Sequence, residues 1–264
     1  MKKFGFILVG IVFLFTSCTQ KDTFDKSKAQ DHLIMSVLWY QRSTEMRALY
    51  YQCFNWAKLR VEMDLLKNPT KTRKAVIVDI DETMLNNSPF ETNCINTGKS
   101  YSSESWKNWT FMENAEALPG AVEFSKFAET KGVEVFYISN RKVDEFDVTL
   151  KNLQKEGFAF ADSSHLILKT TTSDKTVRRD IVKKDHEIIL LIGDSMGDFD
   201  NIFENRKNDY GFSTVDANKK MFGDKYIVLP NPMYGAWEKA VLDFKKGLSD
   251  EEKYNLRKKK LIAY

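Results

Sequence analysis

Five short runs of apolar residues are spaced along the chain, and within each run the apolar positions are continuous rather than alternating. A strand with one solvent-exposed face alternates apolar and polar residues. A strand covered on both faces, as in a parallel sheet, is apolar throughout. The pattern therefore predicts five buried strands. They are "AVIVDI" from Ala75, "VEVFYIS" from Val133, "HLILK" from His165, "IILLIGD" from Ile188 and "YIVLP" from Tyr226.

Helical patterns fill most of the gaps between these runs, and Gly132 and Gly157 are placed as helix C-caps. The predicted helices are "GAVEFSKFAETKG" after Gly120, "VDEFDVTLKNLQKEG" from Val143, "DKTVRRDIVKKD" from Asp174 and "GAWEKAVLDFKKG" near the end. Strands that alternate with helices predict an α/β fold, a parallel sheet with right-handed crossovers.

Two segments depart from this repeat. Residues from about Asp31 to Lys67 predict a long helical stretch or a helix pair, whose many aromatic residues pack on the core. Residues from Asn86 to Leu118 follow the first strand with no regular period, and long polar segments with embedded aromatics are usually lids or caps over a site.

The N-terminus has the pattern of a targeting segment. Lys2 and Lys3 precede an apolar stretch that is short for a membrane span but suits a signal peptide, predicted over residues 1–17. The following "FTSC" resembles a lipobox, which makes Cys18 the lipidated first residue of the mature protein. An alternative is cleavage elsewhere, with Cys18 as an ordinary residue. We expect residues 18–30 to be a lipid-anchored linker and residues 31–264 to form the functional domain.

Composition narrows the choice of function. With 42% hydrophobic residues, the chain can bury the core of one sizeable domain. Its 40 basic and 37 acidic residues nearly cancel, so a nucleic-acid polymer is not an expected partner. A disulfide between Cys53 and Cys94 is one alternative in an oxidising compartment, and two unlinked thiols are the favoured one.

Polar side chains gather where the predicted strands end, which is where open α/β sheets bind their ligands. Each has an ordinary alternative, such as a helix N-cap for Asp79, a turn residue for Ser139 or a solvated cation for Lys175. Their joint occurrence in this order favours a site. The set is Asp79 and Asp81 after the first strand, Ser139 after the second, Lys175 at the start of a helix, and Asp194 and Asp198 after the fourth.

These residues resemble the four motifs of the haloacid dehalogenase (HAD) superfamily, at "DIDET", Ser139, Lys175 and "GDSMGD". The chain resembles the class C acid phosphatases more closely, a family of bacterial lipoprotein phosphohydrolases, in "VDIDETMLNNSPF", "GDSMGDFDN" and "NPMYGAWE". The likeness extends from about Leu38 to Glu238. It implies a HAD-like Rossmannoid parallel sheet flanked by helices, with a helical N-terminal segment and a cap inserted after the first core strand, at about residues 86–118.

The resemblance also implies a mechanism. Phosphate monoester hydrolysis needs up to about 10²¹-fold acceleration, and a hard cation such as Mg²⁺ offsets the repulsion between an anionic ester and an anionic nucleophile. Asp79 is expected to attack phosphorus and form an aspartyl-phosphate, and Asp81 to act as general acid and base. Ser139 and Lys175 are expected to donate to the phosphoryl oxygens, with Lys169 as a rival for the lysine role. The implied metal ligands are Asp79, Asp194, the backbone carbonyl of Asp81, and Asp198 directly or through water.

Four aromatic residues lie in the segments expected to overhang the site: Phe90, Trp106, Trp109 and Tyr234. Their rings are placed to stack a nucleobase or nicotinamide ring, or alternatively to form the core of the cap. The family implies a small phosphomonoester as substrate, such as a nucleoside 5′-monophosphate or nicotinamide mononucleotide, at acid pH.

The family also implies a lipid anchor in a bacterial cell envelope, in the outer membrane, and a homodimer is one arrangement open to the chain. Two other functions would account for part of the sequence. An enzyme of another HAD branch shares the core motifs but not the lipidated N-terminus, and a non-enzymatic surface lipoprotein has no need of the full acidic set.

Overall fold

The computed structural model describes residues 25–69 and 72–264. The predicted signal peptide and Cys18 lie outside these residues. Two short 3-10 turns, Lys26–Lys28 and Asp31–Leu33, open the described part, and Ala29 and Gln30 between them are buried. The packed fold therefore begins before the predicted boundary at residue 31. Within the described residues, no helix combines the length and the apolar character that crossing a membrane requires.

The N-terminal helical stretch is a helix pair, which is one of the two predicted alternatives. Helix α1 covers Ile34–Arg42 and helix α2 covers Thr44–Lys67. Ser43 separates them because its extended backbone ends α1, and its side chain accepts a hydrogen bond from the Met46 amide at 3.0 Å to cap α2. The buried residues of α2 recur every three or four positions, so one face of this long helix packs on the core: Met46, Tyr50, Phe54, Ala57 and Val61.

All five predicted strands are present in one parallel sheet with the order β5-β4-β1-β6-β7. The chain moves outward in one direction from β1 to β4 and β5, and then returns to β6 and β7 on the other side of β1. The strands are β1 (Arg73–Val78), β4 (Val133–Lys142), β5 (Leu166–Lys169), β6 (His186–Gly193) and β7 (Tyr226–Val228).

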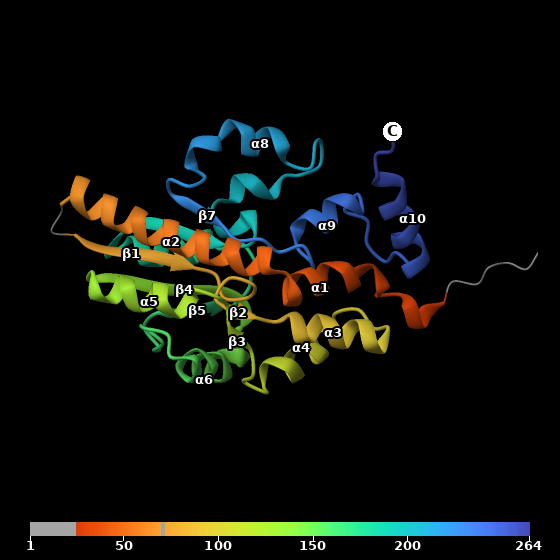
Figure 1. The fold of residues 1–264 in the computed structure, drawn as a ribbon, viewed down its shortest axis with the longest axis horizontal. Coiled ribbons are helices and arrows are strands. Elements are labelled where there is room, and N and C mark those ends of the chain that lie inside the picture. Colours follow the sequence, from red (N-terminus) through yellow and green to blue (C-terminus); the bar gives the residue numbers. More distant parts are fainter. Residues whose placement is uncertain (1–24, 70–71) are drawn as a thin grey trace, which may run out of the picture.

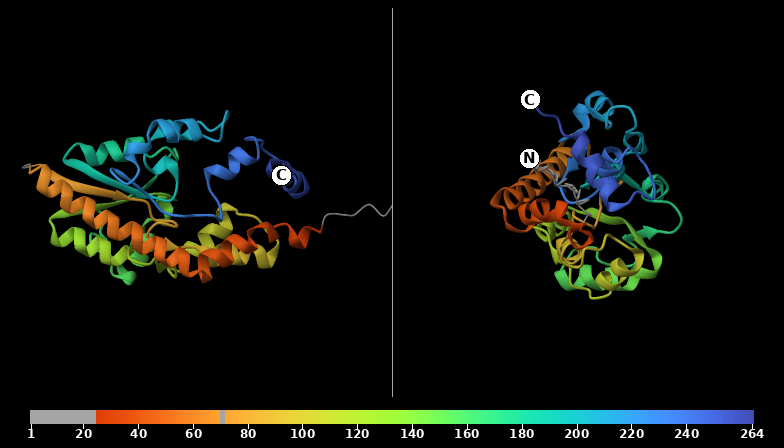
Figure 2. Two further views of the ribbon diagram at one scale, coloured as in Figure 1. Left: turned by 45° about the horizontal axis from the view of Figure 1, so that its top comes forward. Right: turned by 90° about the vertical axis from the view of Figure 1, so that its right-hand side faces the viewer.

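Helices cover both faces of the sheet, which explains the continuous apolar strands (Figures 1 and 2). Helices α2, α5 (Ala121–Thr130) and α6 (Phe146–Glu156) share one hydrophobic cluster with Val76 and Val78 of β1. Helix α7 (Thr176–Lys183) contributes to a second cluster with Ala75 and Ile77, whose side chains point the other way. The α/β class and its parallel sheet are as predicted.

The segment predicted to lack regular structure forms two helices. Strands β2 (Leu85–Asn86) and β3 (Glu116–Ala117) pair antiparallel, and α3 (Ser88–Thr97) and α4 (Ser103–Thr110) lie between them. Asn, Ser and Thr are weak helix formers, so the periodicity was hard to see. Tertiary contacts and a capping box supply the missing stability, for example the bond of 2.9 Å from Thr110 to Glu145.

The C-terminal part also differs from the single helix predicted from "GAWEKAVLDFKKG". Helix α9 covers only Ala236–Val241, because Asp243 and Phe244 take left-handed backbone conformations, with φ of 53° and 56°. A separate helix, α10, covers Asp250–Lys260, and α8 covers Phe212–Ala217. Cys53 and Cys94 are both free thiols.

Replacing Phe54 by alanine should lower the free energy of unfolding by about 3 to 5 kcal/mol, the usual cost of emptying a large core site. Phe54 is fully buried, and its ring centroid lies 5.6 Å from that of Phe124 across α2 and α5. Urea denaturation measures the change. Leu66→Ala on the same helix is the control, because Leu66 is 82% exposed; equal losses in both variants would contradict the packing described.

Candidate active site

The site lies at the carboxyl ends of β1 and β6, the two strands at which the direction of winding reverses. Asp79 directly follows β1 and Asp194 directly follows β6. The strands are neighbours, with Val78 opposite Ile192, and the Asp79 amide donates to the Ile192 carbonyl at 2.9 Å. Open α/β sheets leave a crevice at such a switch point, so two residues far apart in sequence are brought to one cleft.

A tight turn after Ile80 brings Asp81 to the same cleft as Asp79. The Ile80 carbonyl accepts hydrogen bonds from the amides of Thr83, Met84 and Leu85, at 3.3, 2.8 and 2.9 Å. Within the turn, Glu82 has a φ of 56°, a left-handed conformation that costs a residue with a side chain of order 1 kcal/mol or more. Asp79 and Asp81 therefore both line the cleft although they stand two positions apart.

Contacts from distant segments hold the strained Glu82 in place. The Tyr50 hydroxyl donates to the Glu82 carbonyl at 2.5 Å, and the Tyr40 hydroxyl lies 2.5 Å from that of Tyr50. The Glu82 carboxylate accepts from the Asn87 amide at 2.7 Å and from the Tyr234 hydroxyl. Burial first, and then the nearby Asp81, raises the pKa of Glu82 to about 8. These roles were not predicted, because Tyr40 and Tyr50 were expected to be core aromatics and Tyr234 was expected to overhang the site.

Three aspartates meet in the cleft, and one lysine lies among them. Carboxylate oxygens of Asp79, Asp194 and Asp198 all lie within 4.8 Å of one another. The Lys175 ammonium contacts Asp79 and lies 2.7 Å from Asp198 Oδ1, and only 4% of its side chain is exposed. Lys169, the predicted rival, lines the cleft wall but has no ion pair with these aspartates among the described residues.

The electrostatics of this cluster suit a divalent cation. Burial raises the pKa of Asp79, Lys175 opposes this, and the neighbouring aspartates raise it further. Burial and then Asp198 raise the pKa of Asp194. Three carboxylates with a single ammonium leave negative charge uncompensated, and carboxylate oxygens are the ligands that hard divalent cations prefer. The residues therefore fit a divalent metal ion.

Asp81 is surrounded by hydrogen-bond donors, including one residue that sequence reasoning missed. Arg141 donates to Asp81 Oδ1 from Nε at 3.0 Å and from Nη2 at 2.8 Å. Asn87 donates to the same oxygen at 2.9 Å. Ser139 is fully buried and donates to Asp81 Oδ2 at 3.2 Å. In this structure its hydroxyl therefore binds Asp81 and does not face the cleft. The "SNR" stretch was also compatible with a turn. The only sequence signal for Arg141 was its position two residues after Ser139.

Two further arginines, also not predicted, fix the helix that carries Lys175. Arg178 donates to the Ser139 carbonyl at 2.5 Å, and so ties α7 to β4. Arg179 donates to the carbonyls of Gly197 and Asp198, both at 3.1 Å, and so ties α7 to the loop after β6. Lys175 is thereby held between the loops that carry the aspartates.

The four predicted aromatics separate into two pairs. Trp106 and Tyr234 line the cleft, together with Tyr101. Phe90 is buried and packs edge to face on Trp106 at 5.1 Å, and Trp109 donates from Nε1 to Asn87 Oδ1 at 2.8 Å. Neither Phe90 nor Trp109 is on the cleft wall, so their position in the cap is that of supporting residues.

The strand order, the acidic pair after the first strand and the lysine at the start of α7 define a HAD-like hydrolase. The family model for the HAD superfamily, subfamily IIIB (acid phosphatase), matches residues 16–237. The chain therefore belongs to this acid phosphatase family, and it is an acid phosphatase by fold and by family.

Solved structures and curated relatives support this membership. A structure of the class C acid phosphatase from Bacillus anthracis is 40% identical, with a TM-score of 0.85 over 90% of this chain and 99% of that one. The same enzyme with tungstate bound is 39% identical, with a TM-score of 0.84. Vegetative storage protein 1 of Arabidopsis thaliana is 29% identical over 223 residues, 79% of this chain and 69% of that protein.

Replacing Gly193 by alanine should lower activity by about 100-fold, the scale of loss seen when a catalytic group is misplaced by about 1 Å. A Cβ at Gly193 would meet Asp198 Oδ2 at 2.3 Å and Asp198 Cβ at 2.6 Å, so Asp198 must move. The measurement is kcat/KM with p-nitrophenyl phosphate.

Gly132→Ala is the matched control for this substitution. Its φ of 68° makes alanine unfavourable there, but no atom of the described residues lies within 4 Å of the added Cβ. Gly132→Ala should cost about 1 kcal/mol of stability and leave activity intact. Normal activity in Gly193→Ala would contradict the conclusion that the close approach of Asp198 to Gly193 positions the site.

Proposed function

We propose that the protein is a Mg²⁺-dependent acid phosphatase that hydrolyses phosphomonoesters through an aspartyl-phosphate on Asp79. The observation that carries the proposal is the meeting of Asp79, Asp194 and Asp198 with Lys175 in a cleft of about 780 Å³. The tungstate bound to the Bacillus anthracis relative supports it, because tungstate resembles phosphate in shape and charge.

Asp79 is the residue best placed to be the nucleophile. It is buried at the end of β1, its carboxylate faces the cleft, and Lys175 holds it in one orientation. Attack of its oxygen on phosphorus forms a P–O bond to the enzyme and breaks the bond to the leaving alkoxide, and water then cleaves the aspartyl-phosphate. Splitting one difficult displacement into two easier ones is the benefit of covalent catalysis.

Asp81 is the proposed proton carrier. Its carboxylate lies beside Asp79 in the cleft and is oriented by Arg141, Ser139 and Asn87. It would give a proton to the leaving alkoxide and later take one from the attacking water. The Arg141 contact keeps the group in reach of the cleft while it changes protonation state.

The divalent ion is proposed to be Mg²⁺, held by Asp79, Asp194 and Asp198 with the Asp81 carbonyl. Bound there, it would polarise a phosphoryl oxygen and lower the repulsion between the ester and Asp79. Lys175 supplies a fixed positive charge to the same region, and Asn231 orients Asp194 through a hydrogen bond of 2.9 Å.

The substrate range proposed includes nucleoside 5′-monophosphates and nicotinamide mononucleotide. Trp106, Tyr101 and Tyr234 on the cleft wall offer ring faces for a base or nicotinamide, and base stacking on aromatic side chains contributes about 1 to 3 kcal/mol per base. Attachment to a bacterial outer membrane through a lipid on Cys18, and assembly as a homodimer, complete the proposal.

Asp79→Asn should lower turnover of p-nitrophenyl phosphate by more than about 10⁴-fold, because the amide is not a nucleophile towards phosphorus. The variant should fold normally, since an amide replaces a buried carboxylate of the same shape. Asp180→Asn on the exposed side of α7 is the matched control and should keep full activity. Retention of wild-type turnover by Asp79→Asn would refute the assignment.

Removal of divalent metal by a chelator should abolish activity, and adding Mg²⁺ should restore it and raise Tm. At a concentration of 100 Kd the rise should be roughly 5 °C or more. Asp194→Asn should lose most of this shift. Equal activity and Tm with and without metal would exclude a resident ion.

The rise in Tm caused by Mg²⁺ should depend on pH. Since the pKa of Asp79 and of Asp194 is raised in the metal-free fold, their protonated forms persist there, and metal must displace protons to bind. Protonation of these two carboxyls stabilises the metal-free fold at low pH. That stabilisation is lost as pH rises through the raised pKa values. Mg²⁺ should therefore raise Tm more at pH 7.5 than at pH 4.5, as thermal denaturation would measure.

A further inference from the structure

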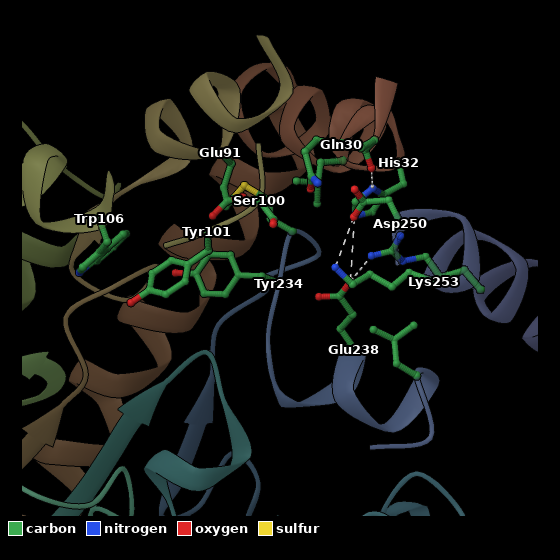
Figure 3. A pocket seen from close by; sticks show the side chains of 15 residues that line it. Gln30, His32, Glu91, Ser100, Tyr101, Trp106, Tyr234, Glu238, Asp250 and Lys253 are labelled. Atoms are coloured by element: carbon green, nitrogen blue, oxygen red, sulfur yellow. Dashed lines mark hydrogen bonds and ion pairs between the residues drawn. The ribbon is translucent and has the colours of Figure 1, made fainter. Parts of the chain in front are cut away.

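A second pocket, of about 340 Å³, opens beside the active-site cleft. Tyr101, Trp106, Tyr234 and Glu238 line both spaces, so the pocket continues the cleft away from the aspartates. Its walls come from the first described turns, from the cap and from the C-terminal helices α9 and α10 (Figure 3). Leu33, Met233 and Leu242 add apolar surface.

Two buried polar side chains in this pocket have no partner within the described part of the chain. Glu91 of α3 is 9% exposed and Gln30 is 6% exposed. Among the described residues, neither side chain takes part in a hydrogen bond or ion pair. Figure 3 shows Glu91 reaching from the cap toward Ser100 and Tyr101, with Gln30 further along the same wall. Buried polar groups are rarely left unpaired, because an unmade bond costs about 1 to 3 kcal/mol and more for a charge.

The other charged groups of the pocket are already neutralised. Glu238 pairs with Arg257 at 2.6 Å, and Asp250 pairs with Lys253 at 3.4 Å. His32 lies 4.0 Å from Glu238. Burial, and then repulsion from Glu238, raises the pKa of Glu91 to about 7. Glu91 is thus an acidic side chain of the pocket that has no donor among the described residues, and it lines the pocket where a ligand could reach it.

We propose that this pocket receives the far end of the leaving group, and that Glu91, with Gln30, selects rings that present an amino group. The inference rests on the proposed function, since it concerns the alcohol part of a phosphomonoester bound in the cleft. A flat ring fits between aromatic and apolar walls, and an amino group supplies the missing donor to Glu91. A ring with an oxo group at that position would set oxygen against carboxylate, and sites built for a donor reject such analogues strongly.

Matched nucleotide pairs test this selection, with AMP against IMP and CMP against UMP differing in an amino or an oxo group. We expect wild-type kcat/KM to favour the amino member of each pair by at least about tenfold at pH 7.5, where Glu91 is mostly ionised. Glu91→Gln should bring both ratios close to one by improving the oxo members, because an amide both donates and accepts. Glu104→Gln, an exposed position on α4, is the matched control and should keep the wild-type ratios.

Two further measurements make the outcome decisive. The Tm of Glu91→Gln should equal or exceed that of the wild type, since an unpartnered buried carboxyl is removed; a large fall would show a structural role and overturn the inference. Ratios of kcat/KM near one in the wild type would overturn the inference, and so would ratios that stay unchanged in Glu91→Gln. In either case, wild-type hydrolysis of p-nitrophenyl phosphate would still support the proposed phosphatase activity. Loss of that hydrolysis in the wild type would instead refute the proposed function, and the inference with it.

Discussion

The structure depends on holding three like charges together at one point of a sheet. Oxygens of Asp79, Asp194 and Asp198 lie within 4.8 Å of one another in a largely buried cleft, an arrangement that electrostatics alone opposes. Three features of the chain enforce it. Strands β1 and β6 pair directly, Gly193 lets Asp198 approach its backbone, and α7 brings Lys175 between the carboxylates. The negative charge that remains uncompensated would favour a bound cation, and that cation would offset the repulsion between the carboxylates and an anionic ester.

Helices outside the sheet also help to position the aspartate cluster. The turn that carries Asp81 contains Glu82 in a strained conformation, and such strain persists only where surrounding contacts fix it. Tyr50 of α2 binds the Glu82 carbonyl, and Tyr234, from the segment before α9, binds its carboxylate. The N-terminal helix pair is therefore more than a cover for the core, because it buttresses the loop that directs two aspartates into one cleft.

The strands and the aspartates that follow them were predictable because their signals are local, whereas Lys175 was chosen over Lys169 because of the family resemblance. A short continuous apolar run bounded by turn signals is typical of a buried strand, and an acid directly after the run lies at the end of that strand. Arg141 was not predictable in this way, since its meaning depends on a contact with Asp81 across 60 positions. The cap helices were missed for a related reason. Their Asn, Ser and Thr residues favour helix weakly, and burial of Phe90 and the bond from Trp109 to Asn87 stabilise them only in the finished fold.

The two ends of the bound ester would meet different parts of the chain. The phosphate end faces groups fixed by the sheet edge, where displacing Asp198 or Lys175 disturbs the whole charge balance. The leaving-group end faces the cap, the first turns and α9 and α10, which share Tyr101, Trp106 and Tyr234 with the cleft but contribute none of the three clustered aspartates. On the proposed function, substitutions in the second pocket should therefore change which alcohol is accepted without altering the chemistry at phosphorus. This separation would let one charge cluster act on many esters, while a few residues, with Glu91 proposed among them, would select between the alcohols.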